Sequence, residues 1–390
     1  MRQRLLTIVL PLGLLLSGSA AIAGWEEGVA ALKAKNYEQA ATEFKGVVEK
    51  QPEWAPGQRM LGQVLIKLKQ TDEALTHLQK AYDLEPADPA TQFALGQAYV
   101  EARRYADGAS ILGKIDRAKL PSSQTSTLDQ LMAVALSKSG QADQALAALA
   151  RAAAASPSDS RVQYQYGVAA LNSGDLPTAI KALDRSVNAK PGGDNQKALV
   201  QALMQQGRRT RNASTKADSY RRATAAATNL SSSNGSFDNL MMLAGAALGA
   251  KQFDSVISAG QRASRSNSSD WLPYFYVGQA FTQKGQYSSA ETELRKALNN
   301  ATSAADKATI WGQLGYVFEK RKSFDEAISA YQQAGNSSAA GRVQKNKETQ
   351  EFNQEVDADN RELEELQKEA EELKEALNKL PGAADPPSLR

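Results

Sequence analysis

Residues 311–331 of the chain read WGQLGYVFEKRKSFDEAISAY. Trp311, Leu314 and Phe318 recur at helical spacing, and Gly315 leaves one place on that face without a side chain. After a polar break, Ala327 and Tyr331 lie one turn apart, on the same face of a second helix. The stretch therefore predicts two helices joined by a short turn.

The same pattern recurs along most of the chain. Gly28, Gly62 and Gly96 are 34 residues apart, and each is followed by a break and a second helix. A small residue of that second helix is repeated with a larger apolar residue four positions later, as Ala40/Phe44, Ala74/Leu78, Gly108/Leu112, Ala145/Leu149, Ala179/Leu183, Ala290/Leu294 and Ala327/Tyr331. Small side chains let the two helices of each hairpin approach closely, so the chain reads as an array of repeats.

This 34-residue period, with W-x2-L-G-x2-F followed by A-x3-Y, resembles the tetratricopeptide repeat family. The resemblance covers about residues 25–340 and implies an all-α solenoid of eight or nine helical hairpins, followed by a long acidic C-terminal helix. A weaker copy at 244–263 carries Val256 in the alanine place, and another is expected between Asn195 and Asn229. Polar residues 228–236 predict a loop, which is a candidate hinge.

We divide the chain accordingly into a signal peptide (1–23), an N-terminal array (24–192), a degenerate repeat with its polar loop (193–236), a C-terminal array (237–340), an acidic helix (341–380) and a disordered tail (381–390).

The N-terminus predicts export. Arg2 and Arg4 precede an apolar run, which ends in small residues at Ala21-Ile22-Ala23 before Gly24. This is the layout of a secretory signal peptide cleaved after Ala23, and an uncleaved membrane anchor is the alternative. We expect a periplasmic or secreted protein with no later transmembrane segment. The chain has no cysteine, which excludes disulfides, a lipid anchor on cysteine and thiolate chemistry.

The C-terminal helix carries a stripe of apolar residues. Leu363, Leu366, Ala370, Leu373, Leu377 and Leu380 alternate three and four residues apart, Phe352 and Val356 extend the stripe backwards, and Asp359 interrupts it. One interpretation is a helix that caps the last hairpin. The other is a short coiled coil that joins copies of the chain through residues 352–380.

Sequence patterns for catalysis are missing. His77 is the only histidine, which excludes metal-binding histidine pairs, and no phosphate-binding glycine loop or nucleophile-elbow motif occurs. We expect no catalytic residue, no metal and no cofactor. The formal charge of +3 falls to about +1 without Arg2 and Arg4, so it does not predict nucleic-acid binding.

The resemblance to tetratricopeptide repeats implies a concave groove lined by first helices. By the family's register its residues here are Arg59, Gln63, Phe93, Gln97, Tyr164, Gln165, Phe275, Tyr276, Gln279 and Tyr316. Aromatic rings beside amides suit a partner protein that presents an extended peptide or a helix. The clamp that relatives use for a C-terminal carboxylate is not reproduced, because Trp25 and Val29 stand at its first-repeat positions.

Three functions remain open from the sequence. The first is a non-catalytic scaffold or assembly factor of the bacterial cell envelope that binds partner proteins in the groove. The second is a structural oligomer or spacer assembled through the C-terminal helix. The third is a regulatory subunit of an envelope enzyme.

Overall fold

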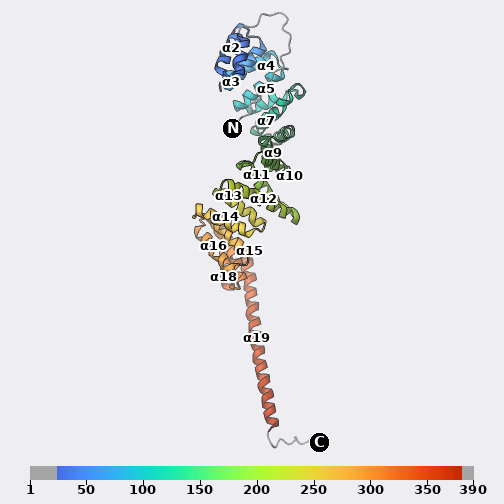
Figure 1. The fold of residues 1–390 in the computed structure, drawn as a ribbon. Helices are drawn as coiled ribbons and strands as arrows, with labels where there is room; N and C mark the ends of the chain where they lie inside the picture. The colour runs from blue at the N-terminus through green and yellow to red at the C-terminus, as the bar shows by residue number, and fades with distance from the viewer. Residues whose placement is uncertain (1–23, 380–390) are drawn as a thin grey trace, which may run out of the picture. The chain divides into compact units, whose positions relative to one another are not determined.

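The computed structural model describes residues 24–379, so the predicted signal peptide and the tail from 380 on lie outside the described residues. The described chain is all-α and forms two compact units, one up to Ala198 and one from Leu199. In the first unit, consecutive helices pair as hairpins (Figure 1). These helices are α1 (Trp25–Lys33), α2 (Tyr37–Lys50), α3 (Ala55–Lys67), α4 (Thr71–Leu84), α5 (Pro89–Glu101), α6 (Tyr105–Gly113), α7 (Ser122–Lys138), α8 (Ala142–Ala155), α9 (Ser160–Ser173) and α10 (Leu176–Ala189).

The boundary between the units falls inside α11 (Gly193–Arg209). The second unit continues with further hairpins and one long helix. Its helices are α12 (Ala213–Ser233), α13 (Phe237–Gly249), α14 (Phe253–Ser266), α15 (Leu272–Gln283), α16 (Tyr287–Asn300), α17 (Ala304–Lys320), α18 (Phe324–Gln333) and α19 (Ser337–Asn378). The predicted all-α array of hairpins followed by a long helix is confirmed.

Hairpins are held by a large side chain of the second helix packed onto a glycine of the first. A β-carbon added to Gly62 of α3 would lie 2.5 Å from Leu78 Cγ of α4. At Gly278 of α15 the corresponding distance to Leu294 Cγ is 2.7 Å. Carbon atoms do not approach so closely, so a larger residue at either glycine would force the helices apart. This contact explains why glycine recurs with the repeat.

The turn inside every described hairpin except α11–α12 contains a left-handed residue. Asn36 N–H donates to the Ala31 carbonyl across 2.9 Å, which closes the end of α1 as a Schellman cap. Lys35, just before it, has φ 62°. The equivalent turns use Lys69, Arg103, Gly140, Gly174, Lys251, Gly285 and Lys322, all with positive φ. Five hairpins therefore place a basic residue where glycine fits with less strain.

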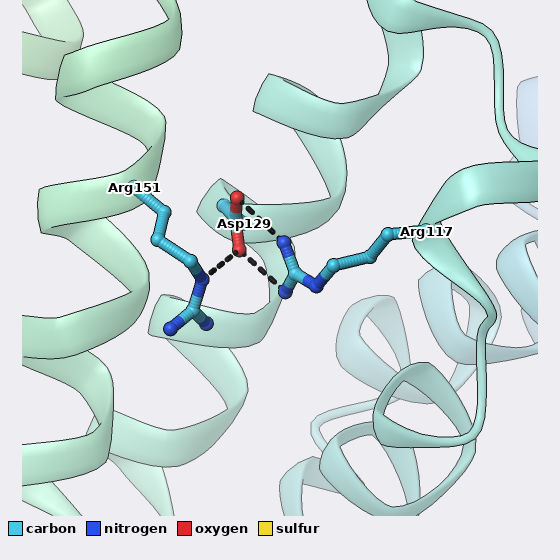
Figure 2. A network of polar contacts seen from close by, with 3 residues as sticks. All are labelled: Arg117, Asp129 and Arg151. Atoms are coloured by element: carbon cyan, nitrogen blue, oxygen red, sulfur yellow. Dashed lines mark hydrogen bonds and ion pairs between the residues drawn. The ribbon is translucent and has the colours of Figure 1, made fainter.

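The link between α6 and α7 departs from the repeat, since Gly108 and Ala145 are 37 residues apart rather than 34. The extra residues form a 3-10 turn, η1 (Arg117–Lys119). Arg117 donates two hydrogen bonds, of 2.7 and 2.9 Å, to the carboxylate of Asp129 on α7. Arg151 of α8 donates a third, of 3.1 Å, and Figure 2 shows Asp129 between the two guanidinium groups. Asp129 is 3% exposed, so this buried carboxylate ties the irregular link to the next hairpin.

The polar segment after α11 is more regular than we expected. The predicted loop at 228–236 is wrong for most of its length, because α12 continues to Ser233 and only Asn234–Ser236 separate it from α13. The hydroxyls of Thr228, Ser231, Ser232 and Ser233 donate to carbonyls three or four residues earlier. Serine and threonine thus satisfy their own hydroxyls without leaving the helix.

Only the first turns of α19 pack on the array. Val343 is fully buried, Lys347 pairs with Asp325 at 2.7 Å, and Arg342 pairs with Glu319 of α17. Every side chain from 351 on that the structure describes is exposed. The capping interpretation therefore holds for residues 337–350 and is wrong for the rest of α19. Among residues 24–379, no helix combines the length and apolarity that a membrane span requires.

Candidate binding surface

The first helices of neighbouring hairpins lie next to one another within each unit. Beyond its own partner, α5 contacts both α3 and α7, and α15 contacts both α13 and α17. In a solenoid, the row of helices that comes closest together is on the inner side of the curve, which is the side that repeat proteins use for binding. Side chains on these helices that remain accessible are therefore the candidate binding residues.

In the first unit, several of the residues predicted to line the groove already contact neighbouring side chains. Arg59 of α3 lies 3.5 Å from the carboxylate of Asp88, with its side chain only 15% exposed. The Gln97 amide donates to Glu101 at 3.1 Å, one turn along α5. Phe93 is half-buried against the core of the next hairpin, so its ring holds hairpins together as well as facing outwards. Gln63 is half-buried and belongs to the same row of first helices.

The pair on α9 remains the best candidate in this unit. Tyr164 and Gln165 are half-buried, and Gln165 Oε1 is a buried acceptor without a hydrogen-bond donor. The preceding residue, Gln163, has a different role, because its amide donates to the carbonyls of Ala153 and Ser156 at 2.7 and 3.3 Å. Gln163 is thus a structural tie, whereas Tyr164 and the unpaired buried acceptor of Gln165 are the candidates for binding.

A glutamine tie of this kind recurs, although sequence reasoning missed it. The amides of Gln58 and Gln92 donate to the carbonyls of Pro52 and Pro86 at 2.8 and 2.7 Å. The sequence contained a signal for this tie, because each glutamine lies six residues after the proline that follows the preceding helix. These buried amides hold the start of the first helix and are not available to a ligand.

The lone histidine belongs to this structural set. The Gln58 amide nitrogen is committed to Pro52, so its oxygen faces His77 Nδ1 at 2.7 Å as an acceptor. The ring must therefore carry a hydrogen on Nδ1. Burial lowers the pKa of His77, and the nearby Glu73 carboxylate opposes that shift. His77 is accounted for as a packing residue.

In the second unit, one of the residues predicted to line the groove is buried instead. Phe275 of α15 is 8% exposed and lies in the core, with its ring centre 5.4 Å from that of Trp271. The family's register placed it in the groove, but the ring faces the hairpin interior, where the larger apolar area is buried. Its neighbour Tyr276 leans over Gly245 of α13, and burial raises the pKa of its phenol while Arg208 opposes that shift.

One hollow in the second unit is lined by glutamines. Gln279 and Gln283 of α15 and Gln313 of α17 surround a space of about 210 Å³, together with Lys251, Phe253, Leu248 and Gly249. Gln279 was predicted, whereas Gln283 and Gln313 were missed. Gln283 lies one helical turn beyond Gln279, so the periodicity of the helix contained that signal. Amide groups from two neighbouring helices offer donors and acceptors to a bound main chain.

An exposed aromatic residue lies on the same helix as Gln313. Tyr316 of α17 is 38% exposed, and Lys320 Nζ lies 5.3 Å from its ring centre. Among residues 24–379, no cluster of three acidic or histidine side chains has the arrangement of a metal site. The accessible chemistry of the first helices is thus made of amides, tyrosines and single charges.

Comparisons with known proteins agree with the repeat geometry. Two family profiles, both described as tetratricopeptide repeat, match residues 65–128, 131–194 and 277–340. The chain is a tetratricopeptide repeat protein. No protein with a curated description matches it.

Several solved structures are similar to parts of this tetratricopeptide repeat protein at low identity. YrrB, described as a TPR protein with an unusual peptide-binding site, is 21% identical, with 48% of this chain and 93% of YrrB covered and a TM-score of 0.41. A MamA double mutant is 16% identical, with 43% and 92% covered and a TM-score of 0.40. The Cut9–Hcn1 hetero-tetramer of APC/C is 12% identical, with 82% and 89% covered and a TM-score of 0.39.

Proposed function

We propose that this tetratricopeptide repeat protein is a non-catalytic scaffold of the bacterial cell envelope that holds a segment of a partner protein on its first helices. The observation that carries the proposal is the glutamine-lined hollow formed by α15, α17 and the turn between α13 and α14. An extended peptide has unpaired N–H and C=O groups along its length, and amide side chains pair with both. Tyr316 is accessible on α17, the helix that carries Gln313, and it adds aromatic contact area at a small entropy cost.

Absence of catalysis is part of this proposal. The residues brought together in the hollow are amides, one lysine and apolar groups, and none of them is a nucleophile paired with a base. His77, the only histidine, is engaged with Gln58. The envelope location rests on the sequence alone, through the export signal that ends at Ala23. N-terminal sequencing of the protein recovered from cells tests it, and the expected first residue is Gly24.

Site-specific photo-crosslinking in intact cells tests the binding surface. We expect a photoreactive residue at Gln279 or Gln313 to trap a discrete partner band. A photoreactive residue at Gln332, an exposed glutamine on the second helix α18, is the matched control and should trap none. Equal crosslinking at Gln313 and Gln332, or none at any of the three sites, would overturn the proposed surface.

A triple variant provides the complementary measurement. Changing Gln279, Gln283 and Gln313 to Ala should abolish co-purification of the partner identified by crosslinking without altering helical content, because these side chains project from the packed hairpins. Changing Gln332 and Gln333 to Ala should leave recovery unchanged. Loss of recovery in both variants would indicate general damage to the array instead of loss of a site.

A further inference from the structure

We infer that residues 352–378 of α19 pair with the same segment of a second copy of the chain, as a parallel, in-register, two-stranded coiled coil. This inference concerns a different surface from the proposed peptide-binding hollow and does not depend on it. It starts from the free part of α19, which forms a continuous helix although none of its described side chains packs on the array.

One face of this free helix is apolar except at Asp359. Its residues are Phe352, Val356, Leu363, Leu366, Ala370, Leu373 and Leu377, and with Asp359 included the spacing alternates four and three without a break. The larger of these side chains are 39–64% exposed. Such a repeat returns to the same side of a helix only if the helix winds around a partner, so the stripe is the seam of a coiled coil.

Charges beside the seam select a second copy in parallel orientation. With Leu363 at position a, the g positions are Glu355, Glu362 and Glu369, and the e positions that face them in a parallel dimer are Asn360, Gln367 and Lys374. Two of these pairs are glutamate with amide and one is an ion pair, so no like charges meet. An antiparallel pair would bring g positions together and oppose glutamate to glutamate. The helix is therefore complementary to itself in one direction.

The seam residues also favour two strands. Leu366 and Leu373 occupy d positions, where leucine favours a parallel dimer, and Ala370 at an a position lets the helices approach closely. Asp359 occupies a d position as well. In the in-register dimer it brings two like-charged carboxylates together at the seam, which weakens the pair.

Replacing Asp359 with an apolar residue should strengthen the dimer, and the same replacement at Asp357 is the matched control. Asp357 lies two residues away at position b, off the seam, and is exposed as Asp359 is. Sedimentation equilibrium of the chain from Gly24 to Arg390, over a wide concentration range, should show a reversible monomer–dimer equilibrium. Asp359→Leu should lower the dissociation constant at least about tenfold. Asp357→Leu should leave it unchanged.

A second pair of variants weakens the assembly. Leu366→Glu should give a monomer at every concentration, whereas Ala358→Glu, the same kind of change at an exposed position off the seam, should dimerise like the parent. A monomeric parent whose Asp359→Leu variant is also monomeric would overturn the inference. Equal effects of Asp357→Leu and Asp359→Leu would show that the assigned stripe is not the seam. A mass of three or more chains would show that the coiled coil is not two-stranded.

Orientation is tested by a single cysteine, because the chain has none of its own. In a parallel, in-register dimer the two copies of residue 356 face each other. Val356→Cys should therefore oxidise to a covalent dimer under mild conditions. A dimer by sedimentation that forms no such disulfide would refute the parallel register.

Discussion

His77 shows how a single half-buried side chain makes stability depend on pH. Its pKa is lowered in the folded chain by burial, so below about 6.5 the unfolded chain binds more protons than the folded one. The contribution of His77 is therefore complete above that pH and is lost as the pH falls towards the lower folded pKa. Because no other histidine titrates in this range, the effect belongs to one residue.

We predict that the urea midpoint falls as the pH is lowered from neutral to slightly acidic, and that it falls less in His77→Gln. Glutamine at 77 keeps a hydrogen-bond donor for Gln58 but does not titrate. The measurement is urea unfolding, followed by circular dichroism, of both proteins across this range. Identical slopes for the two proteins would show that His77 does not carry the dependence.

The basic residues with positive φ are a second feature at the residue scale. Arg103 ends the first helix of its hairpin at φ 61°, where a side chain crowds its own backbone and glycine does not. We predict that Arg103→Gly stabilises the protein by about 0.5–1 kcal/mol, a small net gain because glycine also loosens the unfolded chain. Lys181→Gly, at an exposed position inside α10, should destabilise it by about 1 kcal/mol. Thermal unfolding of the two variants tests the difference in sign.

At the scale of elements, the network around Asp129 decides how one hairpin follows another. The link through η1 is longer than the other links, so helix packing alone does not fix its path. Asp129 supplies the missing constraint, because Arg117 and Arg151 reach it from η1 and α8 (Figure 2). The carboxylate is buried, whereas the two guanidinium groups are 40% and 48% exposed and retain some hydration.

We predict that Asp129→Ala costs about 1–3 kcal/mol of folding free energy. The loss stays below that for a fully buried ion pair, since both arginines can turn towards water. Asp143→Ala, at an exposed aspartate on α8, is the control and should cost less than about 0.5 kcal/mol. Chemical unfolding measures both, and equal losses would contradict the role of the network.

At the scale of the whole molecule, each hairpin packs on its sequence neighbours, so damage should stay near its origin. Ala74 of α4 is fully buried, and its carbonyl oxygen lies 3.2 Å from the β-carbon position of Gly62. Ala74→Leu overpacks this contact and should cost about 1–3 kcal/mol. Because solenoid stability is approximately a sum over neighbouring repeats, the loss should be confined mainly to the first unit.

Hydrogen exchange read by mass spectrometry tests this locality. We expect Ala74→Leu to lose amide protection in α3 and α4 while α15 to α18 keep theirs. Thr76→Leu, at an exposed position of the same helix, should leave protection unchanged throughout. Uniform loss of protection along the chain would show that the two units unfold as one.

The sequence by itself determined the hairpins, because a repeat leaves its packing residues at fixed spacing. Ala74 and Leu78 identify a helix face without knowledge of its neighbours, and both are fully buried as predicted. The heptad stripe of α19 was also readable, since seam residues recur along a single helix. Such local periodicity is set by the geometry of one helix and needs no tertiary information.

Tertiary structure decided what the same helices do with their other faces. The register placed Phe275 in the groove, but packing buried it and left Gln279 accessible one turn away. Tertiary packing also placed Gln313 of the next hairpin at the edge of that hollow. It left the part of α19 beyond about residue 350 without contacts to the array. These outcomes depend on contacts between residues distant in sequence, and a side chain's exposure is the result of every neighbour that packs on it.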